Sequence, residues 1–514
     1  MAKTRRTHRS FPRISLRSNL PLIILLCIAI FLRFALFTQR ISMGPDSMRD
    51  AIVALEGART VQFPISGPFI SIAPVTTGPW YWIQLILFRL LVPTNYAPWI
   101  LLGLYSVLMV FVMYLVGFYL EGKQLGLIMA AVTTFARNQI LVATELVNPS
   151  VIGFYGGVVL LLFIFLWKRG PDKRLGLLLG IVFGIMLTTH YQSAGLVSLL
   201  ITLLLLGRRY LWTFIHALVG IFITFIPLLF FELTNHWFNT RHLLRYLLVD
   251  QYQIWTPMRW LTYVSDFWPR FIAFVLGGEK AFGMIVMLSV AGIFCVQLIR
   301  RRLPRMYLYL LINFFVSVVI IRYYRGERYF GYLQFFHPFL ILFTGYAIHS
   351  VFQLFTSRVF GRFVFILYLV VVVPSSLALL RPTVFTEEVR QLTERTYEVF
   401  GPGPFKLYQC KGATNWEIGG LMLQLAMDRR YSESGRPLIY RWGCNFPDVR
   451  HDGTNIYDTA MGELQEPERF FPKMENLYDV SIASPAAVAA LGWEEISPAE
   501  RYQSAARWWM DEQP

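Results

Sequence analysis

The chain has 514 residues, of which 55% are hydrophobic and 15% are charged. Apolar runs of about 16 to 22 residues recur across its first three quarters, long enough to cross a bilayer as helices. This composition excludes a soluble enzyme and predicts a polytopic α-helical membrane protein. The formal net charge of +16 does not indicate nucleic-acid binding, because basic residues gather in loops between apolar runs, where they set membrane topology.

The N-terminal segment is basic and leads into the first apolar run, 20–37. Six Lys or Arg residues and no acidic residue occur in the first 18 positions. A cleaved signal peptide would have a shorter apolar core and a small-residue cleavage site, and neither is present. We therefore expect residues 1–19 to form a cytoplasmic tail and 20–37 to be an uncleaved first span.

An outer loop, 39–97, follows the first span and contains an apolar, aromatic stretch at 79–90. If this stretch crossed the membrane, every later basic loop would face outward, against the positive-inside rule. We therefore predict a juxtamembrane helix in the headgroup plane, anchored by Trp80 and Trp82.

The transmembrane domain is predicted to extend over 20–382, with eleven spans. The basic loops 168–174, 207–209, 300–305 and 358–362 then all fall in the cytoplasm. The predicted spans after the first are 98–119, 125–142, 150–167, 175–190, 193–207, 211–231, 276–299, 306–321, 333–350 and 363–381.

The tail, 383–514, has the charge content of a soluble protein, and we predict a small extracytoplasmic α/β domain there. Cys410 and Cys444 each follow a predicted strand, and in an oxidising compartment they form either a disulfide or two unrelated thiols. Two strands and an amphipathic helix are predicted, at 405–409, 437–442 and 415–430.

The segment from Asp46 to Asp50 is the strongest candidate for a catalytic centre. Asp46, Arg49 and Asp50 fall on one face of a helix that begins at Pro45. One interpretation is a helix start with a surface salt bridge. The other is a general-base carboxylate beside a phosphate-binding arginine, the pair needed to deprotonate a hydroxyl next to a phosphate leaving group.

Other unusual polar residues also fall in outer loops, which favours chemistry at the outer face. A transporter would instead show ionisable residues near the midplane in two related halves. The outer arginines suit phosphate, with a solvated face as the alternative. Arg33, in the first span, is expected to snorkel outward. The further candidates are Glu145, Asn148, His190, Tyr191, Arg322, Arg325, Arg328 and Tyr329.

Three ordered motifs after the first span resemble the GT-C class of membrane glycosyltransferases. They are an acid-x-x-Arg-Asp sequence from Asp46, a Pro-x-x-Gly-Pro turn from Pro64, and a Gly-Pro-aromatic helix start at Gly78. Asn148-Pro149, His190-Tyr191 and the Arg/Tyr-rich segment 322–329 extend the likeness over about residues 15 to 350. The chain resembles the bacterial protein O-mannosyltransferase and lipid A aminoarabinose transferase group, of the glycosyltransferase family 39 type.

The resemblance implies a role for each matching residue. Asp46 corresponds to the acid that activates the acceptor, and Arg49 to an arginine on the donor phosphate. Ser47 stands where the family often has a second acid, and Asn148 where it often has aspartate. Asp50 and Glu145 are thus catalytic or supporting candidates. Arg322, Arg325 and Arg328 would bind the donor phosphate, and His190, Tyr191 and Tyr329 the substrate.

The expected function is inverting transfer of a sugar from a polyprenyl-phosphate donor to a lipid, glycan or protein acceptor at the outer face of the cytoplasmic membrane. Paired acids are compatible with a divalent metal such as Mg²⁺ or Mn²⁺, but no ligand spacing requires one and no cofactor is predicted with certainty. A flippase for a lipid-linked sugar and a non-catalytic envelope assembly protein are the alternatives.

Overall fold

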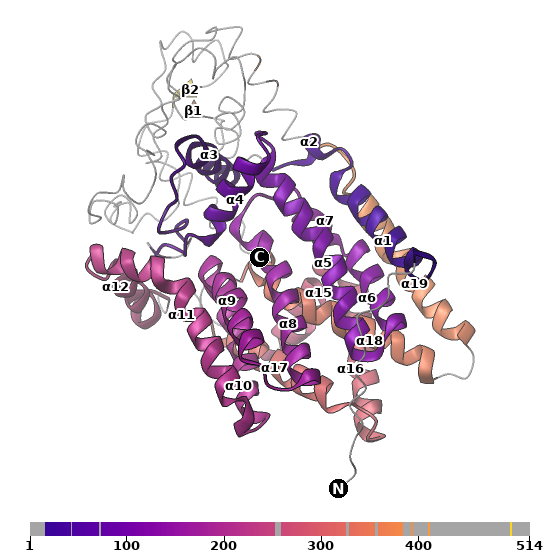
Figure 1. The fold of residues 1–514 in the computed structure, drawn as a ribbon. Coiled ribbons are helices and arrows are strands. Elements are labelled where there is room, and N and C mark those ends of the chain that lie inside the picture. The colour runs from indigo at the N-terminus through magenta and orange to yellow at the C-terminus, as the bar shows by residue number, and fades with distance from the viewer. Residues whose placement is uncertain are drawn as a thin grey trace.

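The computed structural model describes residues 16–383 apart from 43, 71–72, 74, 252–258, 325–327 and 355–357, together with positions 391, 394, 410–411 and 494–495. Nearly all of this part is helical (Figure 1). The predicted elements at 405–409, 415–430 and 437–442 lie outside the described residues, as does Cys444. The short strands β1 (Cys410–Lys411) and β2 (Glu494–Glu495) pair antiparallel. The tail domain and its disulfide stay predictions.

Seven helical segments are long and apolar enough to span a membrane within the part of the chain that the structure describes. Each of the eleven predicted runs contains helix, so a multi-pass membrane protein is confirmed, whereas the count of eleven spans stays a prediction. The seven segments are Ala97–Glu121, Asn148–Arg169, Arg208–Thr234, Lys280–Ile299, Arg305–Tyr323, Phe330–Leu354 and Val359–Leu377.

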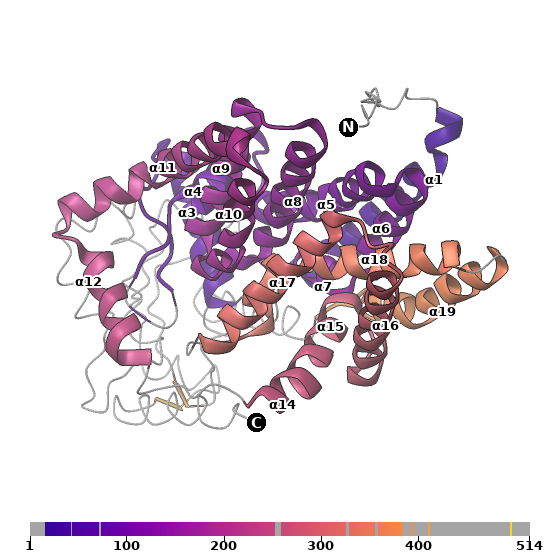
Figure 2. The ribbon, with the colours of Figure 1, turned by 90° about the horizontal axis from the view of Figure 1, so that it is seen from below.

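Two groups of helices form the two sides of the bundle, as the views from the side and from below both show (Figures 1 and 2). One side holds α8 (Ile152–Arg169), α9 (Lys173–Thr189), α10 (Val197–Leu205) and α11 (Leu211–Thr234). The other holds α1 (Leu16–Phe34), α6 (Lys123–Phe135), α16 (Lys280–Ile299), α18 (His337–Leu354) and α19 (Arg358–Leu377).

Shorter elements cross one end of the bundle or connect its helices. Figure 1 places α3 and α4 at that end. The remaining elements are α2 (Phe37–Arg40), α3 (Pro45–Thr60), α4 (Trp80–Leu91), α5 (Ala97–Glu121), α7 (Arg137–Leu141), η1 (Asn148–Val151), η2 (Tyr191–Leu196), η3 (Arg208–Tyr210), α12 (Phe238–Arg245), η4 (Tyr246–Asp250), α14 (Trp260–Thr262), η5 (Tyr263–Phe267), α15 (Trp268–Leu276), α17 (Arg305–Tyr323) and η6 (Phe330–Phe336).

Two predicted spans are interrupted. The run 125–142 breaks at Ala136, between α6 and α7. The run 276–299 begins only at Lys280, because Gly277 and Gly278 adopt positive φ angles of 115° and 80° and end α15.

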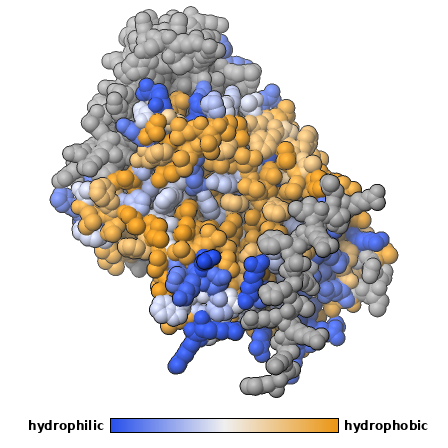
Figure 3. Space-filling view, viewed as in Figure 1, coloured by the Kyte–Doolittle hydropathy of each residue, from blue (hydrophilic) through white to orange (hydrophobic). Residues whose placement is uncertain are grey.

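On the face shown in Figure 3, apolar residues cover a broad area of the bundle, and hydrophilic residues gather below it. Exposed leucine, isoleucine and phenylalanine side chains on α11, α16 and α19 belong to the apolar surface. By contrast, nearly every residue of α18 is buried among other helices. The exposed apolar surface fits contact with lipid, whereas α18 is enclosed by other helices.

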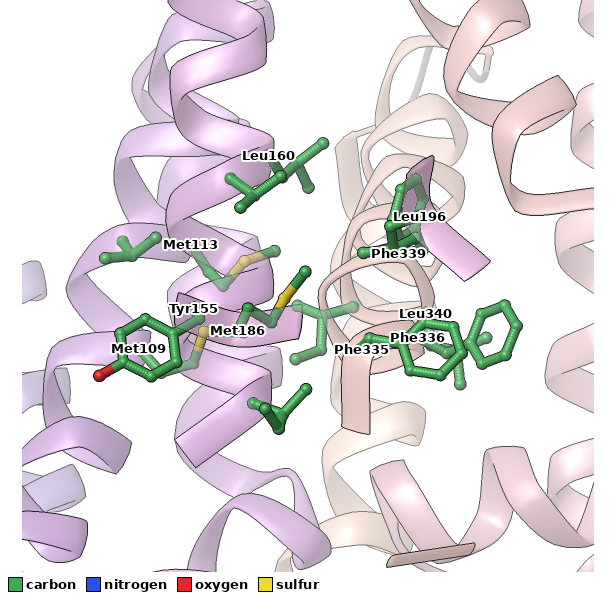
Figure 4. Packing of buried hydrophobic residues seen from close by; sticks show 14 of the residues in the cluster. Met109, Met113, Tyr155, Leu160, Met186, Leu196, Phe335, Phe336, Phe339 and Leu340 are labelled. Carbon is green, nitrogen blue, oxygen red and sulfur yellow. The ribbon is translucent and has the colours of Figure 1, made fainter. Parts of the chain in front are cut away.

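The buried core joins α5, α8 and α9 to η6 and α18. Figure 4 shows Met109, Met113, Tyr155 and Met186 facing Phe335 across this core. Through these side chains η6 packs against α8. The loops that carry the candidate residues are therefore attached to a packed base.

Arg33 does not snorkel to the membrane surface, contrary to the prediction. Its guanidinium is fully buried and donates to Ser106 Oγ at 3.0 Å and to the carbonyls of Thr134 and Thr133 at 2.7 and 3.1 Å. The acceptors belong to α5 and α6, so Arg33 ties the first helix to the bundle because these oxygens satisfy its buried charge.

Candidate functional site

Asp46, Arg49 and Asp50, here called the acid cluster, lie on the first turns of α3, as the spacing predicts. Pro45 begins this helix and Asp46 occupies its first turn. Arg49 Nη1 donates to Asp46 Oδ1 at 2.6 Å, and Arg49 Nε donates to Asp50 Oδ1 at 2.8 Å. The Asp46 side chain is 46% exposed, whereas Asp50 is fully buried. One carboxylate is therefore accessible and the other is enclosed, with the arginine joining them.

Asp50 is held from a second helix by Trp82. The Trp82 Nε1–H group donates to Asp50 Oδ1 at 2.8 Å. Burial raises the pKa of the Asp50 carboxyl, and the Arg49 charge and the Trp82 hydrogen bond act against this rise. Both donors bond to Oδ1, whereas Asp50 Oδ2 is buried without a hydrogen-bond partner among the described residues.

The aromatic stretch 79–90 is helical, as predicted, and forms α4. Trp82 is not a headgroup anchor, however, because it is buried where α4 packs against α3 and α5, while the placement of Trp80 at the headgroups stays a prediction. Trp82 is 1% exposed, and Trp80 Nε1 donates to the carbonyl of Thr224 in α11 at 2.8 Å. Both indole N–H groups therefore bind protein.

Ser47 connects the acid cluster to the loop between α7 and η1. Ser42 and Ser47 share a hydrogen bond of 2.6 Å between their hydroxyls, and Ser47 Oγ donates to the carbonyl of Leu146 at 3.2 Å. The Leu146 amide donates in turn to Ser42 Oγ at 3.2 Å. The serine that departs from the family pattern is thus a buried connecting residue.

The loop between α7 and η1 brings Glu145 and Asn148 to the end of the bundle where α3 lies. Glu145 is partly buried, and burial raises the pKa of its carboxyl to about 7, with the Arg137 charge acting against the rise. Asn148 Nδ2 donates to the carbonyl of Thr189 at 2.8 Å, next to His190. Asn148 therefore joins two loops, and Glu145 can change its charge near neutral pH.

His190 and Tyr191 lie at the turn between α9 and η2. Burial lowers the pKa of His190 to about 4, so its imidazole is neutral at pH 7. His190 Nδ1 has no hydrogen-bond partner among the described residues, and its ring lies 5.2 Å from Tyr332. The Tyr191 hydroxyl donates to the carbonyl of Thr76 at 2.8 Å. The exposed Tyr329 ring lies 5.4 Å from that of Tyr332. The ring contacts of His190 therefore continue to the residue just before η6.

Arg322 is a buried arginine within a group of aromatic rings. It is 7% exposed, and Nε and Nη1 have no hydrogen-bond partner in the described part of the chain. The guanidinium carbon lies 5.3 Å from the Trp260 ring centroid, 5.6 Å from Tyr323 and 6.0 Å from Tyr263. The rings provide cation–π contact but no anion, so within the described part of the chain two donor groups have no partner.

Arg328 has a different role from Arg322. Its Nε and Nη2 groups donate to the carbonyl of Tyr324 at 3.2 and 2.7 Å, just beyond the end of α17. Arg328 thereby donates to a backbone carbonyl just past this helix end. The predicted phosphate-binding residue Arg325 lies outside the described residues.

The structure joins the predicted residues through a sequence of contacts. Ser47 bonds to Leu146 in the loop between α7 and η1, and Asn148 bonds to Thr189 next to His190. The His190 ring contacts Tyr332, which lies beside Tyr329. Sequence reasoning missed Trp82 as a partner of Asp50. Its position in an amphipathic aromatic stretch was the one signal available.

No group of three or more His, Cys, Asp or Glu side chains suited to a metal ion lies within the described ranges. Arg49 bonds to one oxygen of each carboxylate, where a cation shared by Asp46 and Asp50 would otherwise bind. Its positive charge makes this pair a poor fit for a divalent metal.

The fold defines the class: the chain is a helical membrane protein whose fold is similar to that of ArnT. ArnT from Cupriavidus metallidurans bound to undecaprenyl phosphate superimposes with a TM-score of 0.57 and 14% identity, over 88% of this chain and 89% of ArnT. ArnT in the apo state gives 0.53 and 13%, over 79% and 85%. The Archaeoglobus fulgidus oligosaccharyltransferase tethered to an acceptor peptide gives 0.49 and 13%, over 88% and 68%.

At these identities the likeness concerns the fold alone, and it confirms the predicted resemblance at that level. Comparison with protein-family models and with curated proteins gives no match.

Proposed function

We propose that the protein is an inverting glycosyltransferase that uses a polyprenyl-phosphate sugar donor at the outer face of the cytoplasmic membrane. The observation that carries the proposal is the partly exposed Asp46 carboxylate, held by Arg49 on a buried Asp50 at one end of a GT-C fold. A carboxylate that is accessible and fixed in orientation suits a general base.

The proposed reaction is a single displacement. Asp46 takes the proton of an acceptor hydroxyl, whose oxygen forms a bond to the anomeric carbon. The bond between that carbon and the phosphate oxygen breaks, and the polyprenyl phosphate leaves with the electron pair. Because the hydroxyl attacks from the face opposite the leaving group, the configuration inverts.

Arg322 is the best-supported ligand of the departing phosphate. Arg49 is already paired with two carboxylates, so it has little net charge to offer an anion. Arg322 has buried N–H groups without a partner among the described residues, and a phosphate would satisfy them. Its positive charge would stabilise the negative charge that develops on the leaving group. Arg49 and Arg325 remain further proposed contacts, and Arg328 contributes mainly charge.

Support for the donor class comes from the fold and from the surface chemistry. ArnT, with the same fold, has been observed bound to undecaprenyl phosphate. Exposed apolar side chains on α17 and aromatic rings around Arg322 offer a path for a prenyl chain beside a phosphate site. We propose that the N-terminus is cytoplasmic and that the acid cluster, the Arg322 region and the tail are extracytoplasmic. The acceptor is a lipid, glycan or protein hydroxyl.

The test measures sugar transfer by purified protein in proteoliposomes. The donors are a panel of radiolabelled undecaprenyl-phosphate hexoses and pentoses, and a cell-envelope extract supplies acceptors. Asp46→Asn should lower kcat by about a hundredfold or more. The matched control is Asp266→Asn, since Asp266 is also a partly exposed carboxylate paired with an arginine, at 3.1 Å from Arg270.

The outcome separates the alternatives. Donor binding without turnover by the wild-type protein would favour a flippase or an assembly protein. Undiminished transfer by Asp46→Asn would remove Asp46 as the base.

A further inference from the structure

The Trp82 indole is connected to the exposed carboxylate of the site through two other side chains. Trp82 Nε1 and Arg49 Nε both donate to the same oxygen, Asp50 Oδ1, each at 2.8 Å. Arg49 then reaches Asp46 through Nη1 at 2.6 Å. The inner members, Trp82 and Asp50, are almost completely buried, whereas the outer end is accessible.

We propose that Trp82 is a positioning residue for sugar transfer: its N–H group fixes Asp50, Asp50 fixes Arg49, and Arg49 fixes Asp46 in the orientation that receives the acceptor proton. The proposal rests on the proposed function of Asp46. Trp82 contacts no reacting atom; it acts through the three charged groups. Groups that orient a catalytic residue from behind are known to affect the rate strongly.

Hydrogen bonds other than that of Trp82 also attach α4 to the bundle. Trp80 Nε1 already bonds α4 to a backbone carbonyl of α11 at 2.8 Å. Gln84 Oε1 accepts hydrogen bonds from Tyr105, at 2.6 Å, and from Tyr155, which attach α4 to α5 and α8. Because α4 has these separate attachments, the Trp82 N–H group serves the orientation of Asp50.

Charged and titratable groups around Asp50 come from two helices. Arg49 and Asp46 face it from α3, and Tyr81 faces it from α4. The third neighbouring helix, α5, carries Glu121 at its last position as its one charged residue. Loss of the indole hydrogen bond would raise the pKa of Asp50 beyond the rise caused by burial. Asp50 would then lose its charge at a higher pH and release Arg49.

The experiment compares Trp82→Phe with Trp99→Phe in the transfer assay between pH 5 and pH 9. Both residues are buried tryptophans, but Trp99 Nε1 has no hydrogen-bond partner among the described residues. Trp82→Phe should lower kcat about tenfold with little change in KM, the effect of a lost hydrogen bond to a charged group. Its acid limb should also move to higher pH. Trp99→Phe should change neither quantity.

Each result has a defined meaning. If Trp82→Phe matches Trp99→Phe, or loses activity without a shift of the acid limb, the positioning role is wrong while the proposed function stands. If the wild-type protein transfers no sugar from any donor, the proposed function itself fails. Should Trp82→Phe not fold, Asp50→Asn tests the same connection, because it keeps an acceptor for the indole but removes the negative charge that pairs with Arg49. An unchanged kcat in Asp50→Asn would overturn the proposal.

Discussion

The Arg322 guanidinium lies 5.3 Å from the centroid of the Trp260 ring, at the end of α17, and two of its nitrogen atoms are buried without a hydrogen-bond partner among the described residues. A buried guanidinium without an anion is costly, so a ligand that supplies one should gain affinity. The aromatic rings shield the charge from water, which strengthens its attraction for a phosphate.

We expect Arg322→Gln to weaken binding of undecaprenyl phosphate about tenfold or more, because a charge-assisted hydrogen bond is lost. Binding can be measured by native mass spectrometry of the purified protein with added lipid. Arg270→Gln is the control, since Arg270 is an exposed arginine of α15 that pairs with Asp266. Equal affinities for the two variants would exclude Arg322 as the phosphate ligand.

Much of the acid cluster could be predicted from the sequence, because its geometry depends on local helix spacing. The i, i+3, i+4 positions of Asp46, Arg49 and Asp50 determine their shared face once Pro45 begins the helix. The orientation of Trp82 could not be predicted in the same way. An aromatic stretch beside a membrane has the same composition whether its rings face lipid or protein, and only the packing of α4 on α3 distinguishes the two.

The contacts of Arg33 and Ser47 could not be predicted from the sequence either. A single arginine in an apolar run predicts snorkelling unless distant carbonyls accept its hydrogen bonds, and these come from residues about 100 positions away. Ser47 is a departure from the family pattern when the sequence is read alone. Its bond to Leu146 depends on the tertiary approach of two loops.

Glu145 should make stability depend on pH in a defined direction. Burial raises its folded-state pKa to about 7, above the ordinary glutamate value. As pH rises between these two values, the unfolded chain releases the proton first, so the folded state loses stability across this window and stays less stable above pH 7. Glu145→Gln should therefore melt a few degrees higher than wild type at pH 8 and close to wild type at pH 5.

Melting temperatures in detergent from pH 5 to pH 8 test this prediction. Glu279→Gln provides the reference, because Glu279 is exposed. The same pH dependence in Glu145→Gln and wild type would show that Glu145 is not the titrating group.

Ser47→Ala should destabilise the connection between the start of α3 and the loop that joins α7 to η1. The variant removes the hydroxyl that bonds to Ser42 Oγ and to the Leu146 carbonyl, which should lower the free energy of unfolding by about 1 kcal/mol. Ser150→Ala is a matched control, because Ser150 Oγ is buried but has no hydrogen-bond partner in the described ranges. The prediction is wrong if both variants melt at the same temperature.

The contact between α9 and α11 gives a prediction about folding that is independent of the site. A Cβ atom added at Gly180 would lie 1.9 Å from the backbone carbonyl oxygen of Ala217, a distance that requires the two helices to separate. Small residues allow this close approach between membrane helices. Gly180→Ala should therefore cost about 1 to 3 kcal/mol of folding free energy or more, as overpacking does in a tight core. Gly292→Ala, on α16, meets no atom within 4 Å and should leave the yield of folded protein unchanged. Size-exclusion profiles of the two variants in detergent distinguish them, and a monodisperse Gly180→Ala peak with wild-type melting would contradict the close packing of α9 on α11.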